Sequence, residues 1–258
     1  MKNTFGGKAM GANKIIECSR GLKPGQFNMK DIWAAIEWAS RNPQARIPKP
    51  YSGGCHKIMT PSLKSRKRDP NYSSPIVEGT LERNSALLLE FDPLVSHFKA
   101  QPFTLYYHNG DTIAWWIPDF LAWGVNAPPL LIEVKEASAA NDPSTRQKHD
   151  FRKLCVESTG IRCRLITSAE CSLEPRISNL RKLSRKRYRN GLGTLGGDIA
   201  RDNLIAALKK NGGSATYGKL IQQDPEISEH AVALCLYEGS VLSSHKFPVG
   251  PLLDLCLA

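Results

Sequence analysis

The chain has no apolar run approaching the roughly 18–20 residues that a membrane-spanning helix needs. Its first ten residues, MKNTFGGKAM, lack the apolar segment of a secretory signal, so we expect no secretion. The seven cysteines include no Cys-x-x-Cys pair, which argues against a structural zinc site. An odd number of cysteines without a signal indicates reduced thiols. These absences predict a cytoplasmic protein.

Acidic residues are also scarce. The 24 Asp and Glu residues face 35 Lys and Arg residues, which gives a net charge of +11 and a pI of about 9.4. Such an excess favours a polyanionic partner, either nucleic acid or an anionic membrane surface. The chain is 41% hydrophobic and 23% charged, a composition typical of a folded protein rather than a disordered one.

The first 70 residues carry few structural signals. Residues 1–28 show no hydrophobic period and are expected to form an arm, whereas 31–40 read as a short helix. The proline-rich stretch that follows contains the basic residues Lys64, Arg66, Lys67 and Arg68. Two interpretations of these charges stay open, a solvated loop and an arm that contacts phosphates. We predict an N-terminal arm and basic loop over residues 1–70.

Residues 71–172 carry dense signals for an α/β domain. The predicted elements are a helix at 78–91, a hairpin of 102–107 with 112–123, a strand at 130–137, a helix at 143–157 and a strand at 161–166. Asn109-Gly110 suits the tight turn of the hairpin. This order of elements predicts a mixed sheet of at least four strands flanked by helices.

The C-terminal part divides at a glycine-rich stretch. Residues 173–198 comprise a basic helix at 174–189 followed by a linker that is rich in glycine. Residues 199–258 show three short helical patterns and a tail in which 240–244 could pair with 246–249. Three small helices with a hairpin predict a winged-helix or helix-turn-helix module that binds DNA or a partner protein.

The residues with the clearest chemistry lie on neighbouring predicted strands. Glu133 and Lys135 are two residues apart on a strand, so they project from the same face, and Asp119 lies on the strand before. Apolar neighbours surround all three, and charges in apolar strands need pairing or a metal. Carboxylates of this kind hold Mg²⁺, which polarises a phosphoryl oxygen and acidifies a bound water, while a lysine stabilises the developing charge. The spacing alone fits a surface ion pair equally well.

A fourth candidate lies on the helix at 78–91. Glu82 shares a helical stripe with Ala86 and Leu89, so it could lean toward the sheet. Glu78 and Glu90 lie on the same helix and compete with it for this role. The tryptophans 115, 116 and 123 are expected to be packing residues, and any of His97, His108 and His149 is a candidate general base.

Residues 78–135 resemble the catalytic domain of TnsA-type endonucleases, which belong to the PD-(D/E)xK restriction-like superfamily. The similar segments are Leu81-Glu82, Leu88–Pro93, Gln101–Phe103, Pro118–Leu121 and Ile132–Lys135, in that order. The basic helix and the C-terminal module extend the resemblance to about residues 70–258. It implies a restriction-endonuclease-like mixed sheet with a C-terminal winged-helix-like domain.

The same resemblance implies an activity. It assigns Glu82, Asp119, Glu133 and Lys135 as catalytic residues, and Glu82, Asp119, Glu133 and Val134 as the metal-binding set for Mg²⁺, with Mn²⁺ as a substitute. The reaction would be cleavage of the 5′, non-transferred strands at transposon ends in a bacterial cytoplasm. The implied partners are transposon-end DNA, a TnsB-like DDE transposase and a TnsC-like ATP-dependent regulator. A restriction or repair nuclease of the same superfamily and a catalytically silent DNA-binding adaptor remain alternatives.

The basic helix is the candidate DNA-binding surface. Its six basic residues are Arg181, Lys182, Arg185, Lys186, Arg187 and Arg189. A helix leaving the nuclease domain with these charges could lie along the phosphate backbone. A solvated helix face and a docking surface for the regulator are the competing interpretations.

Overall fold

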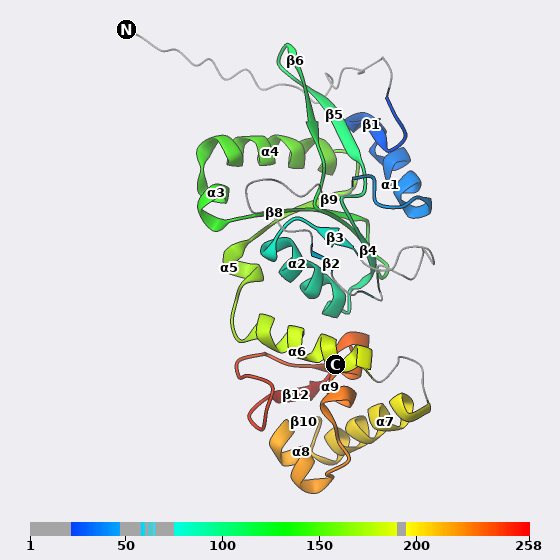
Figure 1. The fold of residues 1–258 in the computed structure, drawn as a ribbon, viewed down its shortest axis with the longest axis vertical. Helices are drawn as coiled ribbons and strands as arrows, with labels where there is room; N and C mark the ends of the chain where they lie inside the picture. Colours follow the sequence, from blue (N-terminus) through cyan, green and yellow to red (C-terminus); the bar gives the residue numbers. More distant parts are fainter. Residues whose placement is uncertain (1–21, 47–57, 60–61, 63, 65–74, 190–194) are drawn as a thin grey trace.

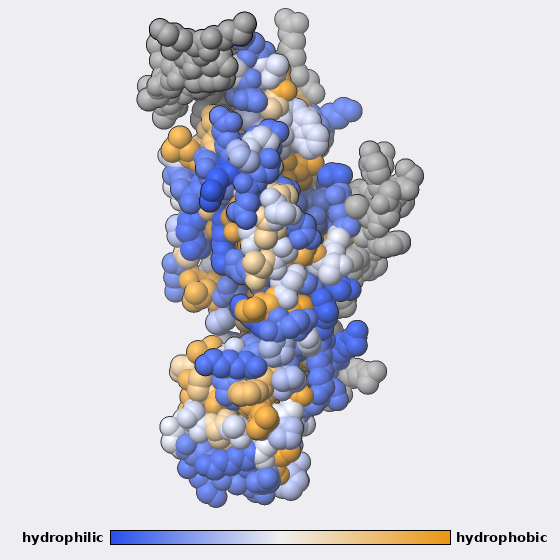
Figure 2. All heavy atoms as spheres, turned by 90° about the vertical axis from the view of Figure 1, so that its left-hand side faces the viewer, coloured by the Kyte–Doolittle hydropathy of each residue, from blue (hydrophilic) through white to orange (hydrophobic). Residues whose placement is uncertain are grey.

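The computed structural model describes residues 22–46, 58–59, 62, 64, 75–189 and 195–258. Within this part the fold is mixed α/β, with nine α-helices and several small sheets. Figure 1 shows an elongated molecule in which a lobe built on a sheet lies above a mostly helical lobe, with α6 (Arg176–Arg189) between them. In the view of Figure 2, hydrophilic side chains predominate and apolar ones form separate patches. No helix of the described residues is both long and apolar enough to cross a membrane.

The central sheet has four strands in the order β4-β7-β8-β9. These strands are β4 (Val95–Ala100), β7 (Phe120–Gly124), β8 (Leu130–Lys135) and β9 (Arg162–Thr167). The β4–β7 and β7–β8 pairs are antiparallel and the β8–β9 pair is parallel. The parallel pair is connected by α3 (Ala137–Asn141) and α4 (Pro143–Glu157). The prediction of a mixed sheet with at least four strands is therefore confirmed, although the strand predicted at 102–107 lies in a separate sheet.

Helices cover both faces of this sheet (Figure 1). On one face, α2 (Thr80–Phe91) packs in a core that contains Ile132 and Val134. On the other face, Leu131 and Cys163 belong to a second core beneath α4. Successive residues of a strand point to opposite faces, so the apolar run of β8 serves both cores. The helices predicted at 78–91 and 143–157 are confirmed.

The hairpin forms, but its second strand is shorter than predicted. β5 (Thr104–Asn109) and β6 (Thr112–Trp116) pair around the predicted turn, in which Gly110 has a φ of +62°. The single strand predicted at 112–123 is wrong, because β6 ends at Trp116 and β7 begins in the central sheet. Pro118 has no amide hydrogen for a strand ladder, and the chain changes sheets around it.

The expected arm is wrong for the last residues of 1–28. β1 (Gln26–Asn28) pairs in parallel with β5, and residues 1–21 lie outside the described part. The helix predicted at 31–40 is confirmed as α1 (Ile32–Arg41), whose buried face joins Met29 and Phe103 in the core under α4. These N-terminal elements therefore pack on the sheet lobe.

Three further elements of this lobe had no sequence prediction. They are β4 and the paired short strands β2 (Ile58–Met59) and β3 (Ile76–Val77). Lys64, next to β2, is buried, and its ammonium donates to the carbonyl oxygens of Leu89 and Asp92. It is therefore no part of a solvated loop, while Arg66, Lys67 and Arg68 lie outside the described residues.

The lower lobe contains three helices and an antiparallel sheet of order β10-β12-β11. The elements are α7 (Leu195–Lys210), β10 (Ser214–Thr216), α8 (Tyr217–Gln223), α9 (Glu229–Glu238), β11 (Val241–Leu242) and β12 (Asp254–Leu257). The pairing predicted for 240–244 with 246–249 is wrong, because β11 pairs with β12. Pro248 and Pro251 lie between these two strands and disfavour the shorter pairing.

The two lobes share one apolar core. Leu88 and Phe91 of α2 belong to the same buried cluster as Leu180 of α6 and Tyr237 of α9. The rings of Phe91 and Tyr237 meet edge to face with centroids 6.4 Å apart. The C-terminal lobe is thus packed directly against the helix that carries Glu82.

Candidate active site

The four predicted catalytic residues converge at one edge of the central sheet. Asp119 lies immediately before β7, and the antiparallel pairing of Phe120 with Ile132 puts it beside Glu133 on β8. Glu82 lies in the first turn of α2. Its charge and that of Glu133 both act on Asp119, and Lys135 acts on Glu82 and Asp119. The structure therefore brings Asp119 within electrostatic reach of the other three side chains.

Glu133 and Lys135 form an ion pair. The distance between Lys135 Nζ and Glu133 Oε1 is 2.7 Å, and the Glu133 side chain is only 8% exposed. Its other oxygen, Oε2, accepts a hydrogen bond from the indole N–H of Trp116. Because Glu133 is buried and also bonded to Trp116, the pair is not the solvated surface pair that the spacing alone allowed, although Lys135 is partly exposed.

Arg152 adds a second cation to Glu133. One of its Nη atoms lies 3.8 Å from Glu133 Oε1, and its guanidinium lies over the ring of Trp116 at 5.4 Å and that of Tyr107 at 5.8 Å. Its Nε donates to the Tyr107 hydroxyl at 3.1 Å. Sequence reasoning missed Arg152 and expected only packing from Trp116. No spacing signal relates Arg152, on α4, to the strand residues that it contacts.

The surroundings of Asp119 disfavour its charged form. Burial, followed by the negative charges of Glu133 and Glu82, raises the pKa of Asp119 well above its usual value. Lys135 and the Val134 amide, which donates to Asp119 Oδ2 at 2.7 Å, oppose this shift without cancelling it. Asp119 therefore holds a proton more tightly than an ordinary aspartate does.

Burial and neighbouring charges also shift the pKa values of Glu82 and Lys135. Burial raises the pKa of Glu82, although its Oε2 accepts a hydrogen bond from the Glu78 amide at 2.8 Å. Burial alone would lower the pKa of Lys135, but the charges of Glu133 and Asp119 outweigh it and raise that pKa. Lys135 is therefore a firmly protonated cation at neutral pH.

The competing glutamates of α2 are engaged elsewhere. Glu78 forms an ion pair with Arg46 at 2.7 Å, and the Glu90 carboxylate accepts a hydrogen bond from Ser62 Oγ at 2.6 Å. Neither is among the groups whose charge acts on Asp119. The structure therefore favours Glu82 among the three candidates.

A cavity of about 260 Å³ opens beside the Glu133–Lys135 pair. Its lining residues are Glu133, Lys135, Thr145, Lys148, His149, Arg152 and Leu165. Burial is the main cause that lowers the pKa of His149, so its imidazole is neutral at physiological pH. Among the candidate histidines, His97 instead stacks on Trp123, with ring centroids 4.3 Å apart, and His108 lies on the hairpin. The cationic lining suits an anionic group.

The donor set suits a divalent cation in chemistry and charge. Carboxylate oxygens are the ligands that Mg²⁺ prefers, and the raised pKa values of Asp119 and Glu82 report negative charge that a cation would neutralise. Asp119 Oδ1 and Glu82 Oε1 accept no hydrogen bond from the described residues. As the side chains stand, however, no three Asp, Glu, His or Cys residues of the described part are gathered tightly enough to hold one ion. Lys135 and Trp116 instead occupy the Glu133 carboxylate.

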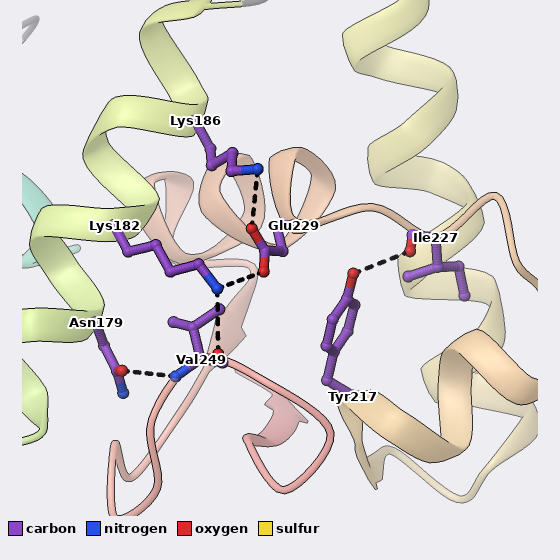
Figure 3. Close-up of polar contacts among 7 residues, drawn as sticks. All are labelled: Asn179, Lys182, Lys186, Tyr217, Ile227, Glu229 and Val249. Carbon is purple, nitrogen blue, oxygen red and sulfur yellow. Dashed lines mark hydrogen bonds and ion pairs between the residues drawn. The ribbon is translucent and has the colours of Figure 1, made fainter.

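The six basic residues predicted on α6 fall into different environments. Lys182 Nζ lies 2.6 Å from Glu229 Oε1 and also donates to the Val249 carbonyl, while Lys186 Nζ lies 3.2 Å from Glu229 Oε2 (Figure 3). Arg181 donates to Asn84 Oδ1 at 2.8 Å, and Arg185 is exposed. The side chains of Arg187 and Arg189 lie outside the described part. Two lysines of the set thus hold the lobes together, and DNA contact by the helix stays a prediction.

Comparison with known proteins gives no independent assignment. No protein-family model matches the chain, and no curated protein matches its sequence. The resemblance to TnsA-type endonucleases therefore rests on the order and content of the sequence motifs. Function must be argued from the site itself.

Proposed function

We propose that the chain is a metal-dependent DNA endonuclease whose active site comprises Glu82, Asp119, Glu133 and Lys135. The observation that carries the proposal is the convergence of three carboxylates and one lysine from α2, the residue before β7, and β8, with the pKa of Asp119 raised by burial and then by its acidic neighbours. Strongly perturbed carboxylates beside a basic cavity are typical of catalytic sites rather than of binding modules. A silent DNA-binding adaptor would gain nothing from them.

The residues of the site have different roles in the proposed reaction. Asp119 and Glu82 offer carboxylate oxygens that accept no hydrogen bond from the described residues, and Val134 fixes Asp119 through its amide. Glu133 orients Lys135, whose ammonium is placed to stabilise negative charge on a phosphate or to orient a water. A bound Mg²⁺ or Mn²⁺ would supply Lewis acidity and an acidified water. Arg152 and Trp116 hold Glu133 in place.

The order of elements supports a restriction-endonuclease-like core. A helix bearing an acid, an antiparallel pair bearing Asp and Glu-x-Lys, and a helical crossover to a parallel strand occur in that order. The lower lobe has the order helix, strand, helix, helix, strand, strand, which supports a winged-helix-like assignment. Both finer fold assignments are part of the proposal.

The sequence resemblance supports a specific biological reaction. We propose that the enzyme cleaves the 5′ strands at transposon ends in a bacterial cytoplasm, together with a TnsB-like DDE transposase and a TnsC-like ATP-dependent regulator. A restriction or repair nuclease would use the same four residues. Dependence of cleavage on a transposon end and on the transposase distinguishes the two.

The test is strand cleavage by the full chain on labelled duplexes that carry or lack the transposon end, with Mg²⁺ or Mn²⁺ and with or without the cognate transposase. Asp119→Ala should lower the cleavage rate at least about 10³-fold, because it removes several kcal/mol of transition-state stabilisation. Asp111→Ala, at an exposed position of the hairpin turn, is the matched control and should cut like the parent. Parental cleavage by Asp119→Ala would refute the site assignment.

A further inference from the structure

Three arginines gather where α2 contacts α6. Arg83 follows the catalytic Glu82 on α2, and Arg181 and Arg185 lie one turn apart on α6. Arg181 Nη2 donates to Asn84 Oδ1 at 2.8 Å, which ties the two helices together at this point. We call Arg83, Arg181 and Arg185 the arginine cluster. Sequence reasoning identified the two residues of α6 but not Arg83.

Within the described part of the chain, the cluster has no acidic partner. Burial, followed by the positive charges of Arg181 and Arg185, lowers the pKa of Arg83. None of the three forms an ion pair with a carboxylate of the described residues, whereas Lys182 and Lys186 share Glu229. Like charges held together without a counterion repel one another. Such an arrangement suits a ligand that brings negative charge.

Donor groups within the cluster are also left unused. The Nε atoms of both Arg83 and Arg181 are buried and have no hydrogen-bond partner among the residues that the structure describes. Buried donors of native proteins are almost always paired, so each unpaired one calls for an explanation. Beside them, Arg181 and Arg185 line a surface groove of about 400 Å³ along α6, together with Ser178, Lys182 and Lys186. The two α6 residues of the cluster therefore combine positive charge with open space, and Arg83 adds a third positive charge that acts with theirs.

We propose that the arginine cluster binds a backbone phosphate of the DNA substrate and thereby seats the duplex beside Glu82. Guanidinium groups bind phosphate oxygens through paired N–H donors, which suits them to this role better than lysine. Arg83 and Glu82 both lie in the first turn of α2, so a phosphate held by the cluster would lie near the end of the helix that carries Glu82. This inference rests on the proposed nuclease function and adds to it the residues that position the substrate.

The proposal separates the basic residues of α6 into two classes. Arg181 and Arg185 contact DNA with Arg83, whereas Lys182 and Lys186 share the carboxylate of Glu229, which offsets one of their two charges (Figure 3). Substitutions in the two classes should therefore have different consequences. The first class should change DNA affinity, and the second should change the packing of the lobes.

The experiment measures binding of duplex DNA against salt concentration in EDTA, so that neither a metal nor cleavage enters. The variants are Arg83→Gln, Arg185→Gln and their combination. Each lost phosphate contact should lower the log–log salt slope by about 0.9 and weaken binding about tenfold at 0.1 M salt. Arg83→Lys, which keeps the charge but not the paired donors, should retain most of the slope and lose affinity. Inorganic phosphate should raise the melting temperature of the parent more than that of the double variant.

Arg162→Gln is the matched control. It removes one positive charge from an exposed residue at the start of β9. Arg162 pairs with Leu130, which lies at the opposite end of β8 from Lys135. It should leave the slope unchanged. If Arg83→Gln does not fold, the salt slope of Arg185→Gln decides the question, because Arg185 is exposed. A parental slope in Arg185→Gln overturns the proposal, and so does a slope that falls equally in Arg162→Gln.

The outcomes also separate this inference from the nuclease function. A parent that cuts DNA while the variants keep its slope and affinity refutes the arginine cluster and leaves the nuclease standing. A parent that binds DNA through the cluster but cuts nothing with Mg²⁺ or Mn²⁺, with or without the transposase, refutes the nuclease and leaves the cluster standing. If the variants of the arginine cluster lose binding to an acidic partner protein and keep the parental affinity for DNA, the proposal is also overturned.

Discussion

Two places in this molecule hold partly buried carboxylates, and they treat the charge in opposite ways. At the junction of the lobes, burial by itself raises the pKa of Glu229, but Lys182 and Lys186 outweigh it and lower that pKa below its usual value (Figure 3). At the edge of the central sheet, burial and two neighbouring carboxylates raise the pKa of Asp119, and Lys135 does not compensate them. One carboxylate is neutralised by its surroundings and the other is not.

The difference indicates what each place is for. A neutralised carboxylate between two packed helices stabilises the contact and needs nothing further from outside. An uncompensated group of acids costs stability in the free protein and is useful only if a cation or substrate completes it. On this argument the junction is structural and the sheet edge is functional. Substitutions can test each half of that distinction.

Apart from the loss of cleavage expected for Asp119→Ala, the largest effect is expected at Lys135. Lys135→Ala should lower the cleavage rate by about 10²–10³-fold, because it removes a preorganised positive charge from the reacting phosphate or water. Its effect on metal affinity should be smaller, since the ammonium is no ligand. Lys135→Arg should rescue little, because the planar guanidinium differs in shape from the ammonium. Single-turnover cleavage across a Mg²⁺ titration separates rate from metal affinity. Parental rates in Lys135→Ala would make the lysine structural.

Much of this site could be predicted because it is encoded locally. Glu133 and Lys135 share a strand, and the apolar residues around them mark that strand as buried. Asp119 follows a proline that lies between β6 and β7, and Glu82 lies in the first turn of a helix whose later residues are rich in leucine and buried. Patterns of this kind fix which residues face the core. The motif order then indicates which of the polar residues come together.

The remaining residues depend on contacts distant in sequence. Arg152 reaches Glu133 only because the crossover helix α4 covers that face of the sheet. Arg83 joins Arg181 only through the packing of α2 on α6, and β4 escaped prediction because His97 and Lys99 interrupt its apolar pattern. The prediction of a single strand at 112–123 was wrong for a local reason, because it ignored that Pro118 interrupts the strand.

The second prediction tests the cost of the uncompensated acids. Asp119→Asn should raise the melting temperature of the metal-free protein at neutral pH while abolishing cleavage. The folded state raises the pKa of Asp119 above the usual 3.8, so the folded form binds this proton more tightly than the unfolded chain. The parent therefore loses stability as pH rises from 3.8 through the raised pKa, and Asn, which does not ionise, avoids that loss.

The measurement is the melting temperature of parent and Asp119→Asn between pH 4 and pH 8 in EDTA. The gain from the substitution should shrink toward pH 4, because it disappears only below the unfolded pKa of 3.8, where both states of the parent hold the proton. Mg²⁺ should also narrow the gap, because it stabilises only the protein that binds it. Asp111→Asn, in the exposed hairpin turn, should show no such trend. A destabilised Asp119→Asn protein at neutral pH would contradict the account.

The smallest effect is expected at the junction. Glu229→Gln should lower the free energy of unfolding by about 1 kcal/mol, because the two lysines are 45% exposed and solvent screens their pairing. The folded pKa of Glu229 lies below the usual 4.5, so its contribution is present above that pH and lost as pH falls through the folded pKa. Urea unfolding at pH 7 and pH 3 measures both, with exposed Glu226→Gln as control. An unchanged urea midpoint at pH 7 would show that the ion pairs of Glu229 add no stability. Reduced DNA binding at unchanged stability would show that this carboxylate is functional. Either result would remove the contrast with Asp119.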